Sequence, residues 1–525
     1  MARRTTCASW ARSRPSSGST SAASRPRSSA CRGAASRRRS CSSPRCSTAA
    51  VCRCRPTRRR WLPRRGRRPC RPGRARRSRG GLRAVESRVE RAGSPRGRVA
   101  SARNQDVPVA RPGEFRPLAL GRLHVWPPVV LAPMAGVTNL PFRSLCREQG
   151  AGLYVSEMIS AKGYLHGNRM TRLLASSSPE ESPRSVQIYG VVPEEVEEMA
   201  HSLVEAGVDH LDLNFGCPVP KVTRCGGGSA LPLKPRLLSA IVRAAVRGAG
   251  AVPVTIKVRK GVDSDLLTFL DAGRVAEAEG AAAIGLHART ARELYSGEAD
   301  WSAITELKAA VSIPVLGNGD IWECWDALRM MRATGCDGVI VGRGCLGRPW
   351  LFAELAAAFD GREPDPPPDL GRVIEILTDH ARRLVAFFGE EHGMRQMRKW
   401  CAWYTKGFHG SAAVRHALVR VGTIDEMLAA LAALDHSEPF PVTALRAVRG
   451  KAGAQARVLL PEGWLADRDG DAPPDESALA RDAQDYEAWG AGGGGPGPPR
   501  PATPPAGGGP RSPAAGPRTR PPATH

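Results

Sequence analysis

The residue whose type and setting most suggest chemistry is Cys217. It follows an apolar run, lies between Gly216 and Pro218, and comes three residues after Asn214. The glycine and the proline would fix the loop, so that the thiol points in one direction. A free thiol has a pKa of about 8.5, so at neutral pH it keeps a proton that it can donate. A single cysteine is also often a small buried apolar residue, and this alternative stays open.

Two glycine-rich stretches, each with charged residues, follow later apolar runs. They are Gly317–Asp320 and Gly342–Gly344, and each precedes a helical pattern. Glycines let backbone N–H groups approach an anion closely, and the first turn of a helix favours negative charge. The two stretches therefore predict a phosphate site. The alternative is that the glycines only make tight turns.

Lys257 and Gln187 place polar groups at the ends of two further apolar runs. A fixed cation beside a pyrimidine-like ring would stabilise negative charge at its N1–C2 carbonyl edge, as a reduced flavin requires. The side-chain amide of Gln187 both donates and accepts, so it would suit the same polar edge. Otherwise Lys257 only extends along a strand end and Gln187 caps a loop.

Eight short apolar runs between residues 115 and 350 alternate with helical patterns and would position these groups. Continuous apolar runs are typical of parallel strands that are buried on both faces. Eight strand–helix units predict a TIM (β/α)8 barrel, in which chemistry sits at the carboxyl ends of the strands. A doubly wound open sheet is the alternative. The predicted strands are Val129–Pro133, Leu153–Met158, Ser185–Tyr189, His210–Phe215, Val254–Val258, Ala283–His287, Pro314–Gly317 and Gly338–Val341.

After Pro366 the strand patterns end and only helical periodicity remains, which predicts a small C-terminal all-helical domain. We expect a disordered Arg/Ser-rich extension over 1–112, the barrel over 113–362, the helical domain over 369–460 and a disordered Pro/Gly-rich tail over 468–525. The two end regions contain too few patterned apolar residues to offset the entropy cost of ordering.

The net charge of +27 comes from the N-terminal extension and not from the predicted barrel. Residues 1–110 contain 31 arginines and three acidic residues, whereas the remaining residues contain 46 basic and 47 acidic side chains. This distribution excludes a uniformly basic, histone-like protein. Three interpretations of the extension stay open. It would be a basic arm that contacts nucleic acid phosphates, an unusually long transit peptide, or the product of a start codon assigned too early.

The sequence contains no run of about 18 apolar residues, which excludes a membrane-spanning helix. It begins without an apolar secretory segment, so we expect a cytoplasmic protein with reduced cysteines. The spacings of the N-terminal cysteines do not match those of zinc ligands, and we expect no bound metal.

Several motifs, in order and at the predicted strand ends, resemble those of bacterial tRNA-dihydrouridine synthases, most closely the B type. The resemblance covers about 120–435. Cys225, followed by three glycines, departs from the family pattern and places a second thiol close to Cys217. The motifs are Leu131–Gly136, Asn214–Lys221, Gly228–Leu231, Leu286–Thr290, Tyr295–Gly297, Ala299–Trp301, Asn318–Asp320 and Val341–Gly344.

The resemblance implies an FMN enzyme that uses NADPH to reduce the C5–C6 double bond of specific uridines in tRNA. Hydride would reach C6 from the reduced flavin, and Cys217 would donate a proton to C5 from the opposite side. Asn214 and Arg289 would face the uracil. The implied FMN-binding residues are Pro133, Met134, Ala135, Gln187, Lys257, His287, Asn318, Gly319, Asp320, Gly342 and Arg343.

The predicted helical domain combines cations with aromatic residues, which suits phosphates and exposed bases. The alternative is a solvated basic face over an aromatic core. The aromatic residues of this segment are Trp400, Trp403, Tyr404 and Phe408. The cations expected to contact tRNA are Arg395, Arg398, Lys399 and Lys406.

Two other functions stay open. One is an FMN barrel oxidoreductase that acts on a small molecule, similar to dihydroorotate dehydrogenase, although this would not explain the helical domain. The other is a non-catalytic RNA-binding protein. No obligate protein partner is evident, and no Gly-x-Gly-x-x-Gly fingerprint opens a helix to separate NADPH from NADH. The target uridine, the oligomeric state and the translation of 1–112 also stay open.

Overall fold

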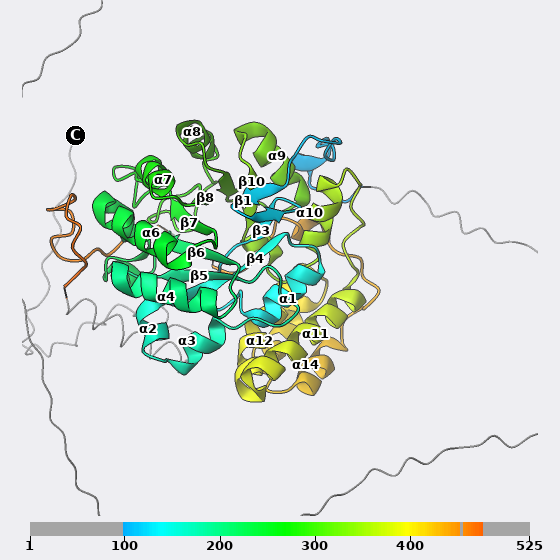
Figure 1. Cartoon of the computed structure of the whole chain (residues 1–525). Coiled ribbons are helices and arrows are strands. Elements are labelled where there is room, and N and C mark those ends of the chain that lie inside the picture. Colours follow the sequence, from blue (N-terminus) through cyan, green and yellow to red (C-terminus); the bar gives the residue numbers. More distant parts are fainter. Residues whose placement is uncertain (1–97, 452–454, 476–525) are drawn as a thin grey trace, which may run out of the picture. The chain divides into compact units, whose positions relative to one another are not determined.

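The computed structural model describes residues 98–451 and 455–475 (Figure 1). Its centre is a closed barrel of eight parallel strands, with β10 pairing with β3 to complete the circle. The predicted TIM barrel is therefore confirmed, and an open sheet is excluded. In their order around the barrel, the strands are β3 (Val129–Leu131), β4 (Leu153–Ser160), β5 (Ser185–Tyr189), β6 (His210–Phe215), β7 (Val254–Arg259), β8 (Ala283–His287), β9 (Val315–Asn318) and β10 (Gly338–Val341).

A short antiparallel pair, β1 (Leu118–Leu120) and β2 (Leu123–Val125), precedes the barrel. Leu118, Leu120 and Val125 are almost completely buried and pack with apolar residues of the barrel interior, such as Val130 and Ile340. This hairpin therefore contributes to the core at one end of the barrel.

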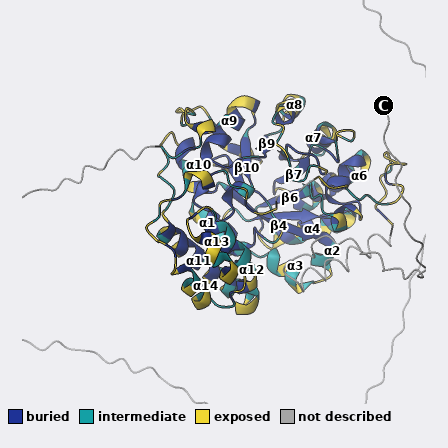
Figure 2. Cartoon of the chain, turned by 180° about the vertical axis from the view of Figure 1, so that it is seen from behind, coloured by how far each residue is buried: buried dark blue, intermediate teal, exposed yellow. Residues whose placement is uncertain are grey.

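Helices surround the barrel and bury one face each against the strands (Figures 1 and 2). In α6, for example, Leu237, Leu238 and Ile241 are buried at helical spacing, and the helix begins at Pro235, whose fixed φ suits a first turn. The helices of the barrel units are α1 (Leu140–Glu148), α4 (Pro193–Glu205), α6 (Pro235–Ala249), α7 (Phe269–Ala278), α8 (Ser302–Ala310), α9 (Cys324–Thr334) and α10 (Leu351–Phe359).

Shorter helices occupy the loops after several strands. They include α2 (Ala161–Leu165), α3 (Arg169–Leu174) and α5 (Pro220–Thr223), together with the 3-10 turns η2 (Gly228–Leu233) and η3 (Arg343–Cys345). Because these turns lie at the carboxyl ends of strands, they shape the mouth of the barrel. No helix among the described residues is both long enough and apolar enough to cross a membrane.

The helical domain packs against α1 of the barrel through aromatic side chains. Trp400 is fully buried, and its ring centroid lies 4.5 Å from that of Phe142 in α1. Tyr404 and Phe408 are also buried. These three aromatic residues form core, so the expectation that they stack on exposed bases is wrong. The helices of this domain are α11 (Leu370–Phe388), α12 (Glu390–Tyr404), α13 (Ser411–Leu418) and α14 (Ile424–Leu431), followed by the 3-10 turn η4 (Val442–Ala444).

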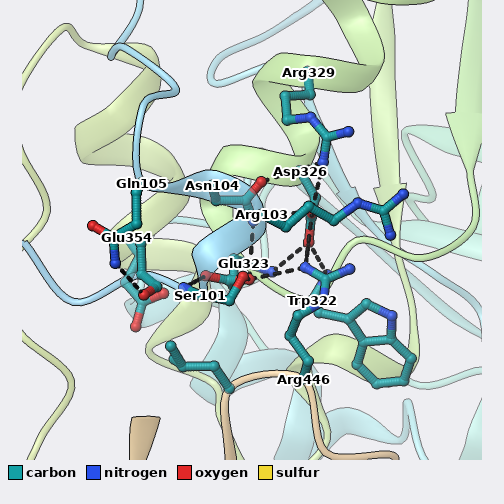
Figure 3. Close-up of polar contacts among 12 residues, drawn as sticks. Ser101, Arg103, Asn104, Gln105, Trp322, Glu323, Asp326, Arg329, Glu354 and Arg446 are labelled. Carbon is teal, nitrogen blue, oxygen red and sulfur yellow. Dashed lines mark hydrogen bonds and ion pairs between the residues drawn. The ribbon is translucent and has the colours of Figure 1, made fainter. Parts of the chain in front are cut away.

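Residues ahead of the expected barrel boundary at 113 belong to the folded structure. The 3-10 turn η1 (Ala102–Asn104) lies against the start of α9, where the buried side chain of Asn104 donates to Glu323 at 2.9 Å and to Asp326 at 3.1 Å (Figure 3). Arg446 also donates to both carboxylates. Side-chain hydrogen bonds, together with buried apolar residues such as Ala100 and Ala110, hold this segment, so composition alone gave the wrong boundary.

The described residues beyond η4 contain no further helix or strand, although the helical domain was expected to reach 460. Instead, this part of the chain returns to the barrel. The indole N–H of Trp464 donates to the carbonyl of Ala230 at 2.9 Å, and Arg468 donates to that of Leu233 at 3.2 Å. The segment therefore packs on η2, which follows the loop that contains Cys217.

Candidate active site at the mouth of the barrel

The loop that carries Cys217 is fixed by hydrogen bonds at its main chain. Asn214 Oδ1 accepts from the backbone N–H groups of Gly216 at 3.3 Å and Cys217 at 3.0 Å, and Ser229 N–H donates to the Cys217 carbonyl at 3.0 Å. Gly228 has a φ of +55°, and a Cβ there would lie 2.4 Å from the Cys217 carbonyl oxygen. Only glycine fits that position, so sequence and backbone together hold the thiol in place.

The Cys217 side chain is half-buried and packs against Met158, Tyr189 and Val222. Burial raises the pKa of this thiol above its ordinary value, and this effect outweighs the hydrogen bond to Val219 and the nearby cations, which lower the pKa. At neutral pH the thiol therefore keeps its proton. The second thiol, Cys225, is only 2% exposed, so it faces the protein interior and not the mouth.

Arg259 is a site residue that the sequence analysis did not single out. It ends β7, two residues after Lys257, and its guanidinium is buried. Its Nε donates to the Gly216 carbonyl at 2.9 Å, and its Nη1 donates to the carbonyls of Thr290 and Leu294. Arg259 therefore ties the Cys217 loop to the loop after β8. Its position at a strand end was the available sequence signal.

A cluster of cations surrounds His287 at the end of β8. Burial lowers the pKa of His287 well below its ordinary value, and Arg259, Lys257, Arg289 and Arg343 lower it further. The imidazole is therefore neutral at physiological pH. Four cations lie around a neutral ring, and the Asp320 carboxylate pairs with two of them, which leaves this part of the mouth positive and suits an anionic ligand.

Arg289 belongs to this cluster and is bound to the loop after β9. Its Nη2 donates to both carboxylate oxygens of Asp320, at 2.9 and 2.8 Å, and to the Gly297 carbonyl. Its Nη1 is buried without a hydrogen-bond partner among the described residues. This orphaned donor fits a phosphate oxygen. In this arrangement the guanidinium lies at the predicted phosphate loop, and its expected contact with uracil stays a prediction.

The two predicted phosphate stretches lie side by side at the mouth. Gly319 has a φ of +135° and Asp320 a φ of +59°, so the chain turns sharply after β9. Arg343, after β10, lies 3.7 Å from Asp320 and above the ring of Tyr295, at 4.7 Å from the centroid. Both stretches therefore present charged side chains to the same place, and the positive φ values belong to the stretch after β9 alone.

The end of β10 also meets the loop after β3. A Cβ at Gly342 would lie 3.7 Å from Ala132 and 3.9 Å from Met134 Sδ. In the same loop, Pro133 and Met134 are half-buried and Ala135 is exposed. The residues expected to line a flavin from this side therefore reach the mouth next to the phosphate stretches.

Lys257 points into the barrel from β7 and contacts β9. Its Nζ donates to Asn318 Oδ1 at 2.9 Å, and Asn318 Nδ2 donates to the Ile340 carbonyl at 2.7 Å. Burial, assisted by Arg259, lowers the pKa of Lys257 to about 8, while Asp212 opposes this shift. The ammonium is thus still mostly charged at neutral pH. Lys257 is therefore held in place at this strand end, and its expected contact with a flavin stays a prediction.

Gln187, on β5, is also directed into the barrel. It is 1% exposed, its Nε2 donates to Asp212 Oδ2 at 2.7 Å, and its Oε1 accepts from Asn214 Nδ2 at 2.8 Å. Asp212 is a second residue that the sequence analysis missed, because an acid in the middle of an apolar strand gives no motif. Gln187 and Asn214 thus lie in one hydrogen-bonded row that ends at the Cys217 loop.

Among the four cations expected to contact tRNA, three make contacts within the protein. Lys399 Nζ donates to the Gly136 carbonyl at 2.5 Å, while Glu157 accepts from the Gly136 N–H at 2.6 Å, so both sides of this peptide are held. Arg398 donates to the Val421 carbonyl at 3.0 Å. Only Arg395, which pairs with Glu391, is exposed, while Lys406 is half-exposed. Contact of these residues with tRNA stays a prediction.

The sequence is similar to a large set of known proteins. The family model described as dihydrouridine synthase (Dus) matches residues 130–438. The chain is 54% identical over 363 residues to a probable tRNA-dihydrouridine synthase of Mycobacterium tuberculosis. The aligned residues cover 67% of this chain and 93% of that protein. It is 40% identical over 312 residues to tRNA-dihydrouridine synthase B of Xanthomonas axonopodis pv. citri. This alignment covers 59% of this chain and 94% of that protein.

Similarity to solved structures is more distant. A morphinone reductase structure, solved in complex with tetrahydroNAD, is 15% identical with a TM-score of 0.33, and covers 49% of this chain and 93% of that one. The family match spans more than half of the sequence and includes the whole mouth of the barrel. The chain belongs to the dihydrouridine synthase (Dus) family.

Proposed function

We propose that this protein reduces specific uridines in tRNA to 5,6-dihydrouridine, with FMN as cofactor, NADPH as reductant and Cys217 as proton donor. One observation above all supports this function. A thiol that keeps its proton is fixed in a rigid loop at the same end of the barrel as a cluster of cations with an orphaned donor. The curated relatives are themselves named tRNA-dihydrouridine synthases.

The residues at the mouth fit FMN. The loops after β9 and β10, with Arg289 Nη1 and Arg343, would hold its phosphate. Lys257 and Gln187 would face the polar edge of its ring, and the loop Pro133–Gly136 would cover it. His287, being neutral, would lie next to the phosphate end without adding charge. When bound, FMN would supply the hydride that adds to C6 of the uracil.

Cys217 would donate its proton to C5 of the uracil. Burial keeps the thiol protonated before the reaction. Arg259, Lys451 and Lys221 each lower its pKa, so they would stabilise the thiolate that remains after the proton has left. Asn214 borders the same loop and would contact the base. The target uridine must leave the stack of the tRNA to reach this site.

The direct test is to add unmodified tRNA to the purified protein and follow NADPH oxidation. We expect a yellow protein, with flavin absorbance near about 450 nm, and NADPH oxidation that is accelerated by tRNA. Mass spectrometry of the tRNA should then show dihydrouridine. A yellow protein that ignores tRNA would favour an FMN oxidoreductase for a small molecule. A colourless protein that binds RNA would favour a non-catalytic role.

Cys217→Ala separates proton donation from the other steps. We expect this variant to bind FMN and to be reduced by NADPH like the wild type, but to turn over tRNA at least about a hundredfold more slowly, as is usual when a general acid is lost. Loss of flavin binding in this variant would contradict the assignment of the thiol. The cytoplasm, where tRNA and NADPH are available, is the compartment we propose.

A further inference from the structure

One side of the barrel interior is polar, although the interior of such a barrel is usually filled by apolar side chains. The register places Ser185 opposite His210 and Gln187 opposite Asp212, across β5 and β6. It also places Asp212 opposite Thr255, across β6 and β7. All five residues are nearly completely buried. Burying such groups costs free energy unless they are hydrogen-bonded, so their arrangement needs an explanation.

These side chains form one continuous hydrogen-bonded row with Asp212 in the middle. On one side, Asp212 Oδ2 accepts from Gln187 Nε2 at 2.7 Å, and Gln187 Oε1 accepts from Asn214 Nδ2 at 2.8 Å. On the other side, Asp212 Oδ1 accepts from Thr255 Oγ1 at 2.6 Å. Thr255 Oγ1 lies 3.0 Å from His210 Nε2, and Ser185 Oγ lies 2.7 Å from His210 Nδ1.

The direction of each amide in the row follows from the groups at its ends. The backbone N–H groups of Gly216 and Cys217 can only donate, so Asn214 must present its oxygen to them. The Asn214 nitrogen then needs an acceptor, which is Gln187 Oε1. Gln187 must in turn give its nitrogen to an acceptor, and Asp212 is that acceptor. A side chain without an acceptor atom at position 212 would leave this order undefined.

We propose that Asp212 is a positioning residue that orients the Cys217 loop through the side-chain amides of Gln187 and Asn214. It does so without touching the thiol, because two amides lie between its carboxylate and the backbone of Cys217. The orientation of the loop by Asp212 is supported by hydrogen-bond geometry. The effect of this orientation on catalysis rests on the proposed function of Cys217.

The row also predicts which substitution of Asp212 is tolerated. Asn in this place can still present its oxygen to Gln187 and turn its nitrogen toward Thr255. Thr255 then donates to His210 Nε2, and His210 Nδ1–H donates to Ser185, so every group keeps a partner. Ala has no acceptor, and Gln187 Nε2 is then left unsatisfied. Asp212→Asn is therefore the conservative variant and Asp212→Ala the disruptive one.

Amide hydrogen exchange of the full-length flavoprotein tests this directly, because the N–H groups of Gly216 and Cys217 are the end of the row. We expect Asp212→Ala to speed their exchange by about tenfold or more, since the acceptor Asn214 Oδ1 is no longer held in place. Asp212→Asn should exchange at the wild-type rate. Ser185→Ala is the matched control, because it removes a buried hydrogen bond from the far end of the same row and should leave both amides protected.

A kinetic readout follows the same variants. We expect Asp212→Ala to lower kcat for tRNA reduction by about tenfold with little change in KM, and Asp212→Asn to restore it. If Asp212→Ala fails to fold, Gln187→Met cuts the row at the next residue, and the exchange of Gly216 and Cys217 should rise in the same way.

Unchanged exchange in Asp212→Ala or Gln187→Met would overturn the proposal, as would an Asp212→Asn variant whose amides exchange as fast as those of Asp212→Ala. The exchange rates do not depend on tRNA chemistry. If they follow the expected order while the wild-type protein does not reduce tRNA, the positioning role stands and the proposed function fails.

Discussion

At the scale of single residues, the Cys217 thiol is subject to two opposing influences. Burial favours the protonated thiol, while Arg259, Lys451 and Lys221 favour the thiolate. A proton donor needs both, because it must keep its proton until the substrate is bound and then release it. The balance is set mainly by burial, and Arg259 is the cation that lowers this pKa most.

Arg259→Met tests this balance. We expect the variant to raise the pKa of Cys217 further, because it removes a cation, and to loosen the loop, because the Gly216 carbonyl loses its donor. The rate of alkylation by iodoacetamide, followed on the peptide that contains Cys217, reports the thiolate fraction. When this rate is plotted against pH, the midpoint of the curve should lie at higher pH for the variant than for the wild type. A midpoint that stays in place or moves to lower pH would contradict this role of Arg259.

The buried carboxyl of Asp212 makes stability depend on pH. Burial raises its pKa from 3.8 to about 6, against the opposing hydrogen bonds of Thr255 and Gln187 and the charge of Lys257. The folded state therefore holds this proton more tightly than the unfolded state does. The stability that results is fully present below about pH 4 and is lost as the pH rises through 6.

Asp212→Asn should remove this pH dependence, because the amide stays neutral. Relative to the wild type, we expect the free energy of unfolding of the variant to increase by about 2–3 kcal/mol between pH 4 and pH 7. Urea unfolding at the two pH values measures the difference. Ser185→Ala, which changes no charge, should show the same difference from the wild type at both. An equal effect of Asp212→Asn on the free energy of unfolding at both pH values would show that burial does not raise the pKa of this carboxyl.

At the scale of elements, the loops after the strands hold the residues of the proposed site, and glycines allow their close contacts. Gly228 illustrates this best, because its positive φ and its distance to the Cys217 carbonyl both exclude a side chain. Gly250, at the end of α6, has nearly the same φ, of +57°, but a Cβ there would meet no atom within 4 Å. A substitution at Gly250 therefore tests backbone strain alone, whereas a substitution at Gly228 tests strain together with steric conflict.

Gly228→Ala should reduce tRNA turnover by about tenfold or more and destabilise the protein by about 2–4 kcal/mol, because strain and overlap add. Gly250→Ala should cost only about 1 kcal/mol, from backbone strain alone, and leave turnover unchanged. Thermal unfolding and steady-state kinetics of both variants provide the comparison. Equal effects of the two substitutions would mean that contact with the Cys217 loop is unimportant.

The strands and the site were predictable from sequence to different degrees. All eight barrel strands were predicted because each is a mostly apolar run, and reading their carboxyl ends led to Cys217, Lys257 and both glycine-rich stretches. Asp212 and Arg259 were missed, because their partners are set by register between strands and by loops far away in sequence. Neither relation leaves a local pattern.

At the scale of the whole molecule, charge must act locally. Residues 111–525 contain nearly equal numbers of basic and acidic side chains, so the folded enzyme has no general attraction for tRNA. Within the helical domain, the exposed Arg395 and the half-buried Lys399 occupy neighbouring turns of α12 but have different surroundings. Arg395 faces solvent, whereas Lys399 joins this domain to the loop after β3 through the Gly136 carbonyl.

These surroundings predict different effects for the two cations. Arg395→Ala should weaken tRNA binding by a similar factor for all tRNA substrates and reduce the slope of log Kd against log salt by about 0.7–1, as expected for one lost phosphate contact. Its kcat should change little. Lys399→Ala should leave the salt slope unchanged but lower kcat and stability, because the Gly136 carbonyl loses its donor and Glu157 loses a nearby cation.

Binding titrations at several salt concentrations, together with kinetics, distinguish the two roles. Lys399→Arg offers a further comparison, since it keeps the charge but replaces a compact ammonium that fits a single carbonyl. If Lys399 acts through phosphates, the arginine should bind tRNA at least as well as lysine and keep kcat. If it acts by joining the two domains, arginine should leave the salt slope unchanged and restore little of the lost turnover, because a planar guanidinium does not reproduce the contacts of one ammonium with both the Gly136 carbonyl and Gln396 Oε1.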